Sequence, residues 1–463
     1  MRLLTLSAVI ALFFCGSLNA QNWSQWRGPL GTGHAPHKEV LENWSVDSNL
    51  AWKVKLPAPG NSTPVTWDKK VFVSMASADG KQRGTYCYSL DDGELLWNHS
   101  VTREAEDKTH MTNPFCASSP TTDGSLVYSW YGSAGLVAYT LDGKIAWQKD
   151  LGVFQHIWGT ASSPVVFEDL LILNCGPGLN AYWIALDKKT GDEVWKREVP
   201  DAKSESVEEF RGSWSTPIIS GAGQDAMMFI SMPMRLYAVN PRTGDIKWTC
   251  GGLQKLVYTS PLITSDIAVT MGGYSGPAFA VKRGGSGDVT EERRLWHHTE
   301  RKQIPQRVGS GVIVGEHIYI LNEPGIAWCI ELKTGKTTWQ QRLGDTRTWS
   351  SMSYLDGKLY VVNMKGTSFV LKPNPEQCEI IAENGQLTWD GINNSLVYNN
   401  FNSNRAEQVV EPGKYNHNDM YLSQMKYFIE SIEHQRRNME SIEEAIKTVE
   451  IILNVKLSNE RVS

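Results

Sequence analysis

Short apolar stretches alternate with polar turns along most of the chain, and the arrangement repeats. Each repeat has an apolar strand, a polar turn that contains Gly, and a second strand that ends at Trp, as in residues 185–195 and 238–248. In these turns an Asp or Asn side chain bonds backbone amides two residues on, while Gly adopts a positive φ angle. The pattern therefore predicts β-hairpins.

The Trp residues that close the repeats return with a period near 48. Successive spacings are 45, 50, 48, 53, 48 and 43 residues, and the seven residues are Trp52, Trp97, Trp147, Trp195, Trp248, Trp296 and Trp339. Four short strands within such a period are typical of propeller blades. We expect the rings to pack between neighbouring blades, as structural residues and not as ligand sites.

A second recurring sequence, usually two hydroxyl residues followed by Pro, opens each repeat and marks seven inner strands. It occupies residues 61–64, 117–120, 161–164, 214–217, 258–261, 308–311 and 349–352. We predict a mainly β fold: a seven- to eight-bladed β-propeller of four-stranded antiparallel blades over residues 21–375, with the last blade incomplete. Residues 50–56 are expected to supply an outer strand to that blade.

The N-terminus has the composition of a signal peptide over residues 1–20. Arg2 precedes an apolar stretch over residues 3–14, and small residues lie near Ala20. A lipoprotein cysteine at Cys15 is the alternative. The chain is therefore expected to be exported to the periplasm or outside the cell, without a transmembrane segment. The net charge of −5 shows no basic excess, which disfavours nucleic acid as a partner.

Cysteine and histidine do not indicate chemistry in this sequence. After Cys15 there are six Cys residues, with no Cys-x-x-Cys spacing, and buried free thiols are favoured over disulfides. Adjacent His297 and His298 on a strand would point to opposite faces, which favours an exposed polar pair over a metal site. No catalytic residue and no metal site are predicted.

Residues 21–375 resemble the pyrroloquinoline-quinone-like (PQQ-like) propeller repeat proteins. The resemblance rests on the repeats and on residues 23–29, 156–159, 212–217 and 307–311. It implies an eight-bladed ring related to quinone-dependent alcohol dehydrogenases and to the outer-membrane assembly propeller. Those enzymes hold PQQ with an adjacent Cys pair, a stacking Trp and a calcium site, and this sequence has no adjacent Cys pair. No cofactor is expected; a PQQ- and calcium-dependent dehydrogenase is the alternative.

Residues 376–463 resemble the C-terminal end of the glucose-fructose oxidoreductase and inositol dehydrogenase family (Gfo/Idh/MocA). The resemblance rests on residues 378–391 and 415–421, and it makes this part a small α+β tail, which is either a gene fusion or an error joining two reading frames. The nicotinamide-binding fold is missing, since residues 284–287 lack the required glycine spacing. The tail cannot catalyse hydride transfer alone.

Strands near residues 386–398 are candidates to replace the missing blade. Two amphipathic helices are expected, one with an apolar stripe and one opening with a capping box at residues 441–444; the stripe is Tyr421, Met425, Phe428, Ile429 and Ile432.

A binding site, if the propeller has one, is expected at the mouth of the central channel, where residues just before each inner strand converge. The aromatic, cationic and amide side chains there suit sugars, quinones or an acidic peptide; the alternative is that they only satisfy loops between blades. We predict a non-catalytic scaffold for a protein or glycan partner. The candidates are His156, Trp158, Arg211, Trp214, Tyr258, Arg307 and Trp349, with His110, Asn113, Lys255 and Gln306 in the same ring.

Overall fold

The computed structural model describes the chain from residue 22 to residue 410, with gaps. The described residues are 22–35, 40–42, 44–45, 47–274, 276–300, 308–323, 325–343, 347–382, 385–390, 395–400 and 405–410, and side chains are described up to residue 381, apart from that of Pro200. The expected signal peptide, Gln306, Arg307 and the expected tail helices lie outside this part of the chain.

The strands follow one another in four-stranded antiparallel sheets, which we call blades 1 to 7. Within a blade, each strand pairs with the next along the sequence, from the innermost to the outermost. The first four blades are β2–β5 (Val65–Trp67, Lys70–Ala76, Gln82–Ser89, Leu95–Thr102), β6–β9 (Thr121–Thr122, Leu126–Trp130, Leu136–Thr140, Ile145–Lys149), β10–β13 (Val165–Phe167, Leu170–Cys175, Tyr182–Asp187, Glu193–Glu198) and β15–β18 (Ile218–Ser220, Met227–Met232, Arg235–Val239, Ile246–Gly251).

Blades 5 to 7 have the same plan, with additions. They are β20, β21, β22 and β24 (Leu262–Ile263, Ile267–Met271, Ala278–Lys282, Arg294–His298), β25–β28 (Val312–Val314, His317–Asn322, Ile326–Glu331, Thr337–Arg342) and β29–β32 (Ser353–Leu355, Lys358–Val362, Ser368–Lys372, Cys378–Ala382). The additions are β1 (His34–Ala35), β14 (Gly212–Ser213), β19 (Leu256–Val257), β23 (Gly287–Asp288), α1 (Thr290–Arg293) and three 3-10 turns (Gly132–Ala134, Pro200–Ala202, Gly223–Asp225).

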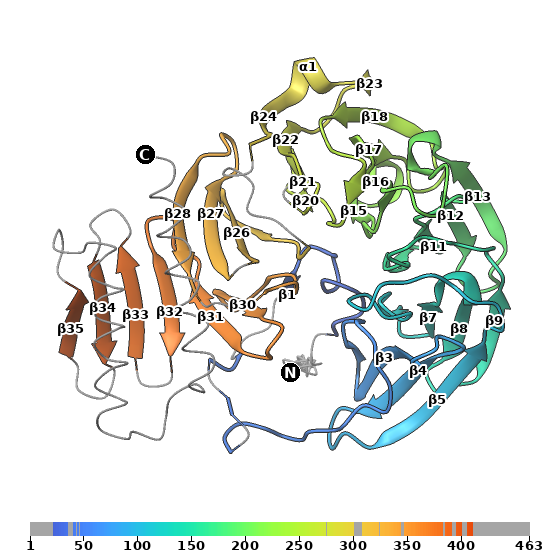
Figure 1. The fold of residues 1–463 in the computed structure, drawn as a ribbon, viewed down its shortest axis with the longest axis horizontal. Coiled ribbons are helices and arrows are strands. Elements are labelled where there is room, and N and C mark those ends of the chain that lie inside the picture. The colour runs from blue at the N-terminus through green and yellow to red at the C-terminus, as the bar shows by residue number, and fades with distance from the viewer. Residues whose placement is uncertain are drawn as a thin grey trace, which may run out of the picture.

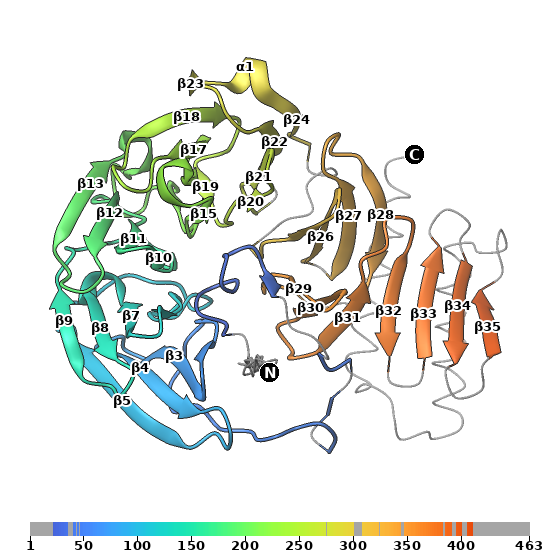
Figure 2. The same ribbon diagram turned by 180° about the vertical axis from the view of Figure 1, so that it is seen from behind.

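The blades succeed one another around a common axis, as Figures 1 and 2 show from opposite sides. Apolar side chains of neighbouring blades pack against each other: one cluster joins blades 3 and 4 through Trp183 and Tyr237, and another joins blades 6 and 7 through Tyr319 and Leu359. The core therefore lies between sheets, which confirms the prediction of a mainly β propeller built from four-stranded antiparallel sheets.

The recurring Trp residues tie each blade to the next. Trp97 in blade 1 packs on Gly143 of blade 2, where a Cβ would lie 2.7 Å from the ring, and its Nε1–H donates to the carbonyl of Leu141 over 3.0 Å. This explains why the turn contains Gly. Equivalent Nε1–H bonds of 2.8–3.1 Å join Trp52 to Leu90, Trp147 to Lys188, Trp195 to Pro241, Trp296 to Leu332 and Trp339 to Asn374.

Trp248 is buried without this bond, because blade 5 has a different turn. Its third and fourth strands are connected through β23 and α1, and β23 pairs in parallel with β18, the strand that carries Trp248. The ring packs instead among Phe279, Val281 and Val289. Six of the seven Trp residues thus lie on outermost strands and pack against the next blade, this one in an altered setting, whereas Trp52 lies outside the strands and packs on blade 1.

The second recurring sequence builds a belt of hydrogen bonds around the axis. In blades 1 to 6, its third residue donates its backbone N–H to the hydroxyl of the corresponding residue in the next blade, over 2.9–3.3 Å. The belt runs through Thr63, Ser119, Ser163, Thr216, Ser260, Ser310 and Ser351. Each hydroxyl thus satisfies a backbone amide that a neighbouring blade would otherwise leave unpaired.

Two expectations about the last blade are wrong for the described residues. Residues 50–56 contain no strand, and Trp52 packs on Gly93 of blade 1 and not on the last blade. The tail strands β33 (Gly385–Asp390), β34 (Ser395–Asn400) and β35 (Arg405–Val410) do not form a separate blade, because β33 pairs with the free outer edge of β32. They extend the sheet of blade 7 away from the ring (Figure 1).

Residues 22–35 form a plug in the middle of the ring (Figure 2). Backbone N–H groups of blades 1 and 2 donate to the carbonyls of Trp23 and Ser24, and β1 pairs in parallel with β29 of blade 7. Arg27, buried and at a φ of 63°, extends to blade 6, where its guanidinium donates to the carbonyls of Ser310 and Gly311. The plug therefore connects the first blades of the ring to the last ones.

Candidate functional site

One face of the ring carries the longest connections, and we call it the loop face. Because all blades are antiparallel, the connections from an outermost strand to the next innermost strand emerge on the same side as the loops between second and third strands. The candidate residues His156, Trp158, Arg211, Trp214 and Tyr258 all lie in connections of this kind between β9 and β20. These five residues therefore lie on the same face of the ring.

Six aromatic rings gather on the loop face over blades 2 to 5. Trp158 lies at their centre, with ring centroids 5.3 Å from Phe210, 5.9 Å from Tyr258 and 6.3 Å from Tyr274. We call this group the aromatic platform; it consists of His156, Trp158, Phe210, Trp214, Tyr258 and Tyr274.

Backbone hydrogen bonds hold the buried part of the platform in place. The short parallel pair β14 and β19 sets Trp214 beside Tyr258, with the Trp214 backbone N–H bonded to the carbonyl of Val257. The two rings stack with centroids 4.9 Å apart and an interplanar angle of 8°. The Trp214 Nε1–H donates to the carbonyl of Gly159 over 2.9 Å, which links this stack to the loop that carries Trp158.

His156 and Asn113 hold the loop around Trp158. The backbone N–H of Trp158 donates to Nδ1 of His156 over 3.1 Å, and Asn113 donates from Nδ2 to the carbonyl of Trp158 over 2.6 Å. Burial lowers the pKa of His156, against the smaller effect of nearby backbone groups of Glu209 and Arg211. His156 is therefore a neutral structural residue at neutral pH, and we assign it no acid–base role.

The outer part of the platform is open to solvent. Phe210 is 56% exposed and Tyr274 is 49% exposed, whereas Trp214 is 7% exposed. The hydroxyl of Tyr258 is buried and has no hydrogen-bond partner among the described residues. Exposed aromatic rings supported from below by packed rings are the arrangement found at binding hot spots, because the rings are rigid and lose little entropy on binding.

Charged residues border the platform. Arg211 Nε lies 3.0 Å from Oε1 of Glu209, and Lys255 Nζ lies 3.8 Å from the same oxygen. The pKa of Glu209 is lowered, chiefly by the hydrogen bond from the backbone amide of Glu205 and to a smaller extent by Arg211, so Glu209 is ionised at neutral pH. The border thus offers both signs of charge to a partner.

The structure separates Trp349 from the platform and adds two rings that the sequence analysis missed. Trp349 is not one of the platform rings: it lies in the connection between β28 and β29 and donates from Nε1 to Oε2 of Glu323 over 3.1 Å. Phe210 and Tyr274 lie in irregular loops without a repeat. The one feature of the sequence that could have indicated Phe210 is its position as an aromatic residue within the charged segment of residues 205–211. Arg307 and Gln306 lie outside the described residues.

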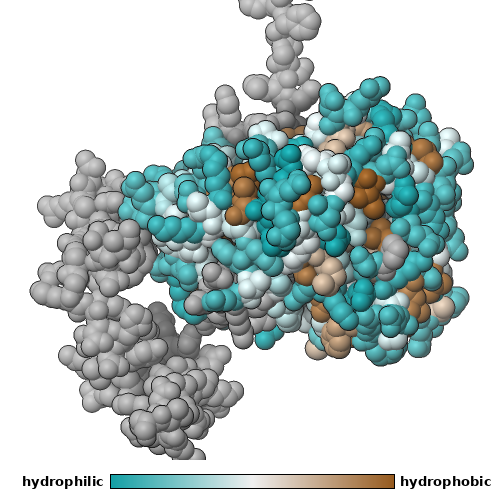
Figure 3. Space-filling model, turned by 90° about the horizontal axis from the view of Figure 1, so that it is seen from above, coloured by the Kyte–Doolittle hydropathy of each residue, from teal (hydrophilic) through white to brown (hydrophobic). Residues whose placement is uncertain are grey.

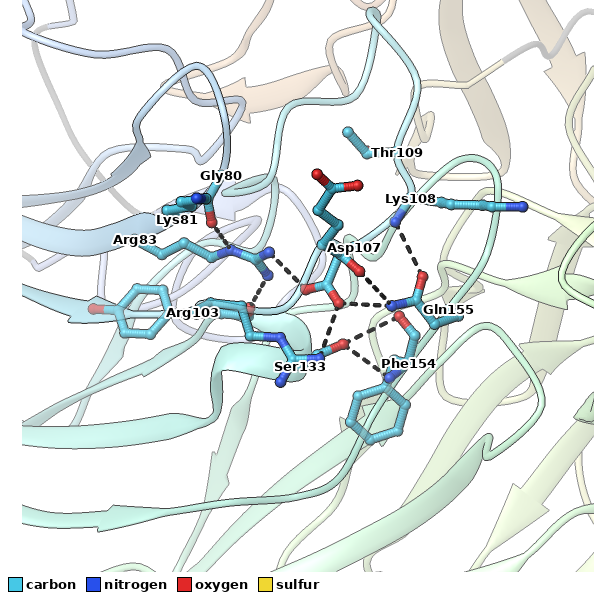
Figure 4. A network of polar contacts seen from close by, with 12 residues as sticks. Gly80, Lys81, Arg83, Arg103, Asp107, Lys108, Thr109, Ser133, Phe154 and Gln155 are labelled. Atoms are coloured by element: carbon cyan, nitrogen blue, oxygen red, sulfur yellow. Dashed lines mark hydrogen bonds and ion pairs between the residues drawn. The ribbon is translucent and has the colours of Figure 1, made fainter.

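Beside the platform lies a small, open polar cleft, which the sequence did not indicate (Figure 4). At its base, Asp107 accepts from Arg83 over 2.6 Å and from Arg103 over 3.2 Å. Gln155 also donates to Asp107, over 2.8 Å. The lining residues are Arg83, Asp107, Lys108, Thr109, Phe115, Ser133, Phe154, Gly159 and Thr160.

Neither metal-binding nor thiol chemistry is indicated in the described part of the chain. No group of three or more His, Cys, Asp or Glu residues there could hold a metal ion. His298 packs on Trp296 and His297 contacts the carbonyl of Gly252, so both are half-buried and not the exposed pair expected. The six cysteines within the described residues are free and buried, as predicted. Burial raises the pKa of Cys87 to about 12, so its thiol is protonated at neutral pH.

A family model described as outer membrane protein assembly factor BamB matches residues 44–270 and 285–415. Among solved structures, BamB from Moraxella catarrhalis has a TM-score of 0.49 and 15% identity, over 79% of this chain and 97% of that one. A europium-containing methanol dehydrogenase has a TM-score of 0.41 and 11% identity, over 76% and 89% of the two chains. The quinohemoprotein alcohol dehydrogenase ADHIIG from Pseudomonas putida HK5 has a TM-score of 0.40 and 11% identity, over 76% of each of the two chains.

No curated protein matches the sequence. None of the helices in the described residues is long and apolar enough to span a membrane.

Proposed function

The chain belongs to the repeat family described as outer membrane protein assembly factor BamB, and on that premise we propose that it is an exported, non-catalytic β-propeller that binds a protein partner through the aromatic platform. The observation that carries the proposal is the pairing of exposed Phe210 and Tyr274 with a rigid support of packed rings beneath them. The family description, an assembly factor, favours a protein as the partner.

A protein fits the platform better than a glycan does. Phe210 meets Trp158 at 71° and Tyr274 meets Tyr258 at 41°, so the open rings do not form the single flat surface on which a sugar ring would stack. The bordering Arg211, Glu209 and Lys255 provide the polar rim that surrounds an aromatic core in protein interfaces. Elsewhere, on the side of the ring that Figure 3 displays, apolar side chains lie in small separate areas among hydrophilic ones.

The alternative, a quinone-dependent dehydrogenase, fits these residues poorly. The sequence has no adjacent Cys pair, and the platform rings pack on each other, with Trp158 in contact with several of them. Reconstitution with PQQ and Ca²⁺ tests this alternative. We expect no quinone absorbance to remain with the protein after gel filtration and no dye reduction with alcohols or sugars.

Site-specific photo-crosslinking tests the proposal directly. A benzophenone amino acid at position 210 in cells that export the protein should give a discrete adduct, identified by mass spectrometry as a peptide of another protein. The same probe at position 194, on outer strand β13 where Val194 is 51% exposed, is the matched control and should give no such adduct. A sugar adduct at position 210, or the same protein adduct at both positions, would reject the proposal.

A further inference from the structure

The polar cleft and the aromatic platform share one loop. Trp158 belongs to the platform, whereas the next two residues, Gly159 and Thr160, line the cleft. Asn113 bonds the carbonyl of Trp158 and its own carbonyl accepts from Oγ1 of Thr109, another cleft residue, over 2.5 Å. A partner seated on the platform therefore reaches the cleft without leaving the surface.

The network at the base of the cleft contains more positive than negative charge. Asp107, with a side chain 5% exposed, is shared by Arg83 and Arg103, which are 3% and 19% exposed. Nε of Arg103 is buried and has no hydrogen-bond partner among the described residues. One carboxylate thus forms ion pairs with two guanidinium groups in a place shielded from water, where a charge without a counter-charge raises the free energy of the folded protein.

The other donors of Arg83 are already used, whereas the opening of the cleft has further polar groups. Arg83 donates from Nε to the carbonyl of Gly80 and from Nη1 to the carbonyl of Tyr131, each over 2.8 Å (Figure 4). At the opening, Lys108 is 54% exposed and pairs with Glu208, which is 65% exposed. An exposed pair of this kind contributes little to stability, so exchanging Glu208 for another carboxylate costs little.

Two acidic residues of the same loop remain outside the cleft. Glu104 and Glu106 are exposed, and neither lines the cleft. Solvent and salt screen exposed charges more strongly than buried ones. The field inside the cleft is therefore set mainly by Arg83, Arg103 and Asp107, whereas Lys108 and Glu208 at the opening are exposed and screened.

Building on the proposed function, we propose that the cleft binds an acidic side chain, Asp or Glu, of the protein partner that occupies the platform. The carboxylate accepts hydrogen bonds from Lys108 at the opening and compensates the excess positive charge of the arginine pair. Thr109 and Thr160 contribute hydroxyl groups to the same lining. Charge-assisted hydrogen bonds of this kind are stronger than neutral ones, so the cleft selects an acid over its isosteric amide.

Two blocked dipeptides test this selection, acetyl-Phe-Glu-amide and acetyl-Phe-Gln-amide, with affinity measured by saturation-transfer NMR titration. The wild-type protein should bind the Glu peptide about fivefold more tightly, and added salt should reduce the difference. Lys108→Gln should bring the two affinities to within about twofold, as should Arg103→Gln. Lys69→Gln, which removes an exposed lysine paired with Asp91 elsewhere on the ring, should leave the preference unchanged.

The outcomes separate this inference from the proposed function. Equal affinity of the wild-type protein for both peptides, or binding of neither, overturns the acidic-side-chain inference, while the crosslink at position 210 still reports on the platform. Phe210→Ala should weaken the binding of both peptides and leave the ratio of their affinities unchanged. A Lys108→Gln variant that folds normally and keeps the full preference for Glu also overturns the inference.

Discussion

Replacing Arg27 with Met removes two of the hydrogen bonds between the plug and blade 6 while keeping a long side chain. The guanidinium makes four hydrogen bonds to backbone carbonyls, over 2.6–3.2 Å: two to the plug itself, at Gly31 and Thr32, and two to Ser310 and Gly311. No carboxylate among the described residues accepts from it, and burial lowers its pKa to about 9, so it is still protonated at neutral pH. Met at this position keeps the same strained backbone, with a φ of 63°.

The expected loss follows from the two bonds to blade 6. A hydrogen bond from a charged donor contributes about 1.5–3 kcal/mol, so their loss costs roughly 3–6 kcal/mol. Met avoids the cost of burying a charge, which offsets part of this loss. We therefore expect Arg27→Met to lower the unfolding free energy by about 3 kcal/mol. Arg27→Lys should lower it by less, because an ammonium keeps some of the hydrogen bonds but has fewer donors, set closer together, than a guanidinium.

Urea denaturation, followed by Trp fluorescence, measures this loss. Arg197→Met is the matched control: its side chain is 41% exposed and pairs with Asp245, so the loss should stay below about 1 kcal/mol. Hydrogen exchange should also become faster in the amides of Thr66 and Thr122, which bond to the plug. An Arg27→Met variant no less stable than Arg197→Met would refute the conclusion that the plug holds the first and last blades together.

Three further perturbations test the ring and its core. Trp147→Phe removes the hydrogen bond to the next blade but keeps a ring, so it should lower the unfolding free energy by about 1 kcal/mol. Trp147→Ala also removes the ring and should lower it by about 3 kcal/mol. Equal losses in the two variants would assign the effect to the hydrogen bond alone. Burial lowers the pKa of His156 below its ordinary 6.5, so stability is full above pH 6.5 and falls as the pH drops below it, more steeply than in His156→Gln. A flat pH dependence in both proteins would contradict the buried neutral ring. All six described thiols should resist Ellman's reagent in the native protein and react after unfolding, because burial keeps them protonated; rapid native reaction would show that they are accessible.

The repeats made the blade architecture predictable from sequence. Hairpin turns and closing Trp residues are local signals, and a period repeated six times makes them unambiguous. The roles of the recurring hydroxyls were not predictable, since each bond joins residues in different blades, as between Ser119 and Ser163. The plug was also missed, because Arg27 bonds to Ser310 across 283 residues. Residues 50–56 have a strand-like sequence, but Trp52 packs on the turn of blade 1.

The candidate site was predictable where it coincided with the repeat. His156, Trp158, Trp214 and Tyr258 stand at or near the start of inner strands, so their position in the repeat placed them on one face. Phe210 and Tyr274, together with Arg83 and Asp107 of the cleft, lie outside the repeat or come together only through loops of different blades. For these residues neither spacing nor residue type indicates which neighbours they meet.

The affinity of the crosslinked partner for a Phe210→Ala, Tyr274→Ala double variant tests the central claim, that the platform is the binding surface. Calorimetry should show at least about 100-fold weaker binding, since a pair of aromatic anchors contributes roughly 3 kcal/mol or more. An Ile145→Ala, Val194→Ala variant, altered at outer-strand positions that are 52% and 51% exposed, should bind like the wild type. Equal affinity of all three proteins would contradict the account.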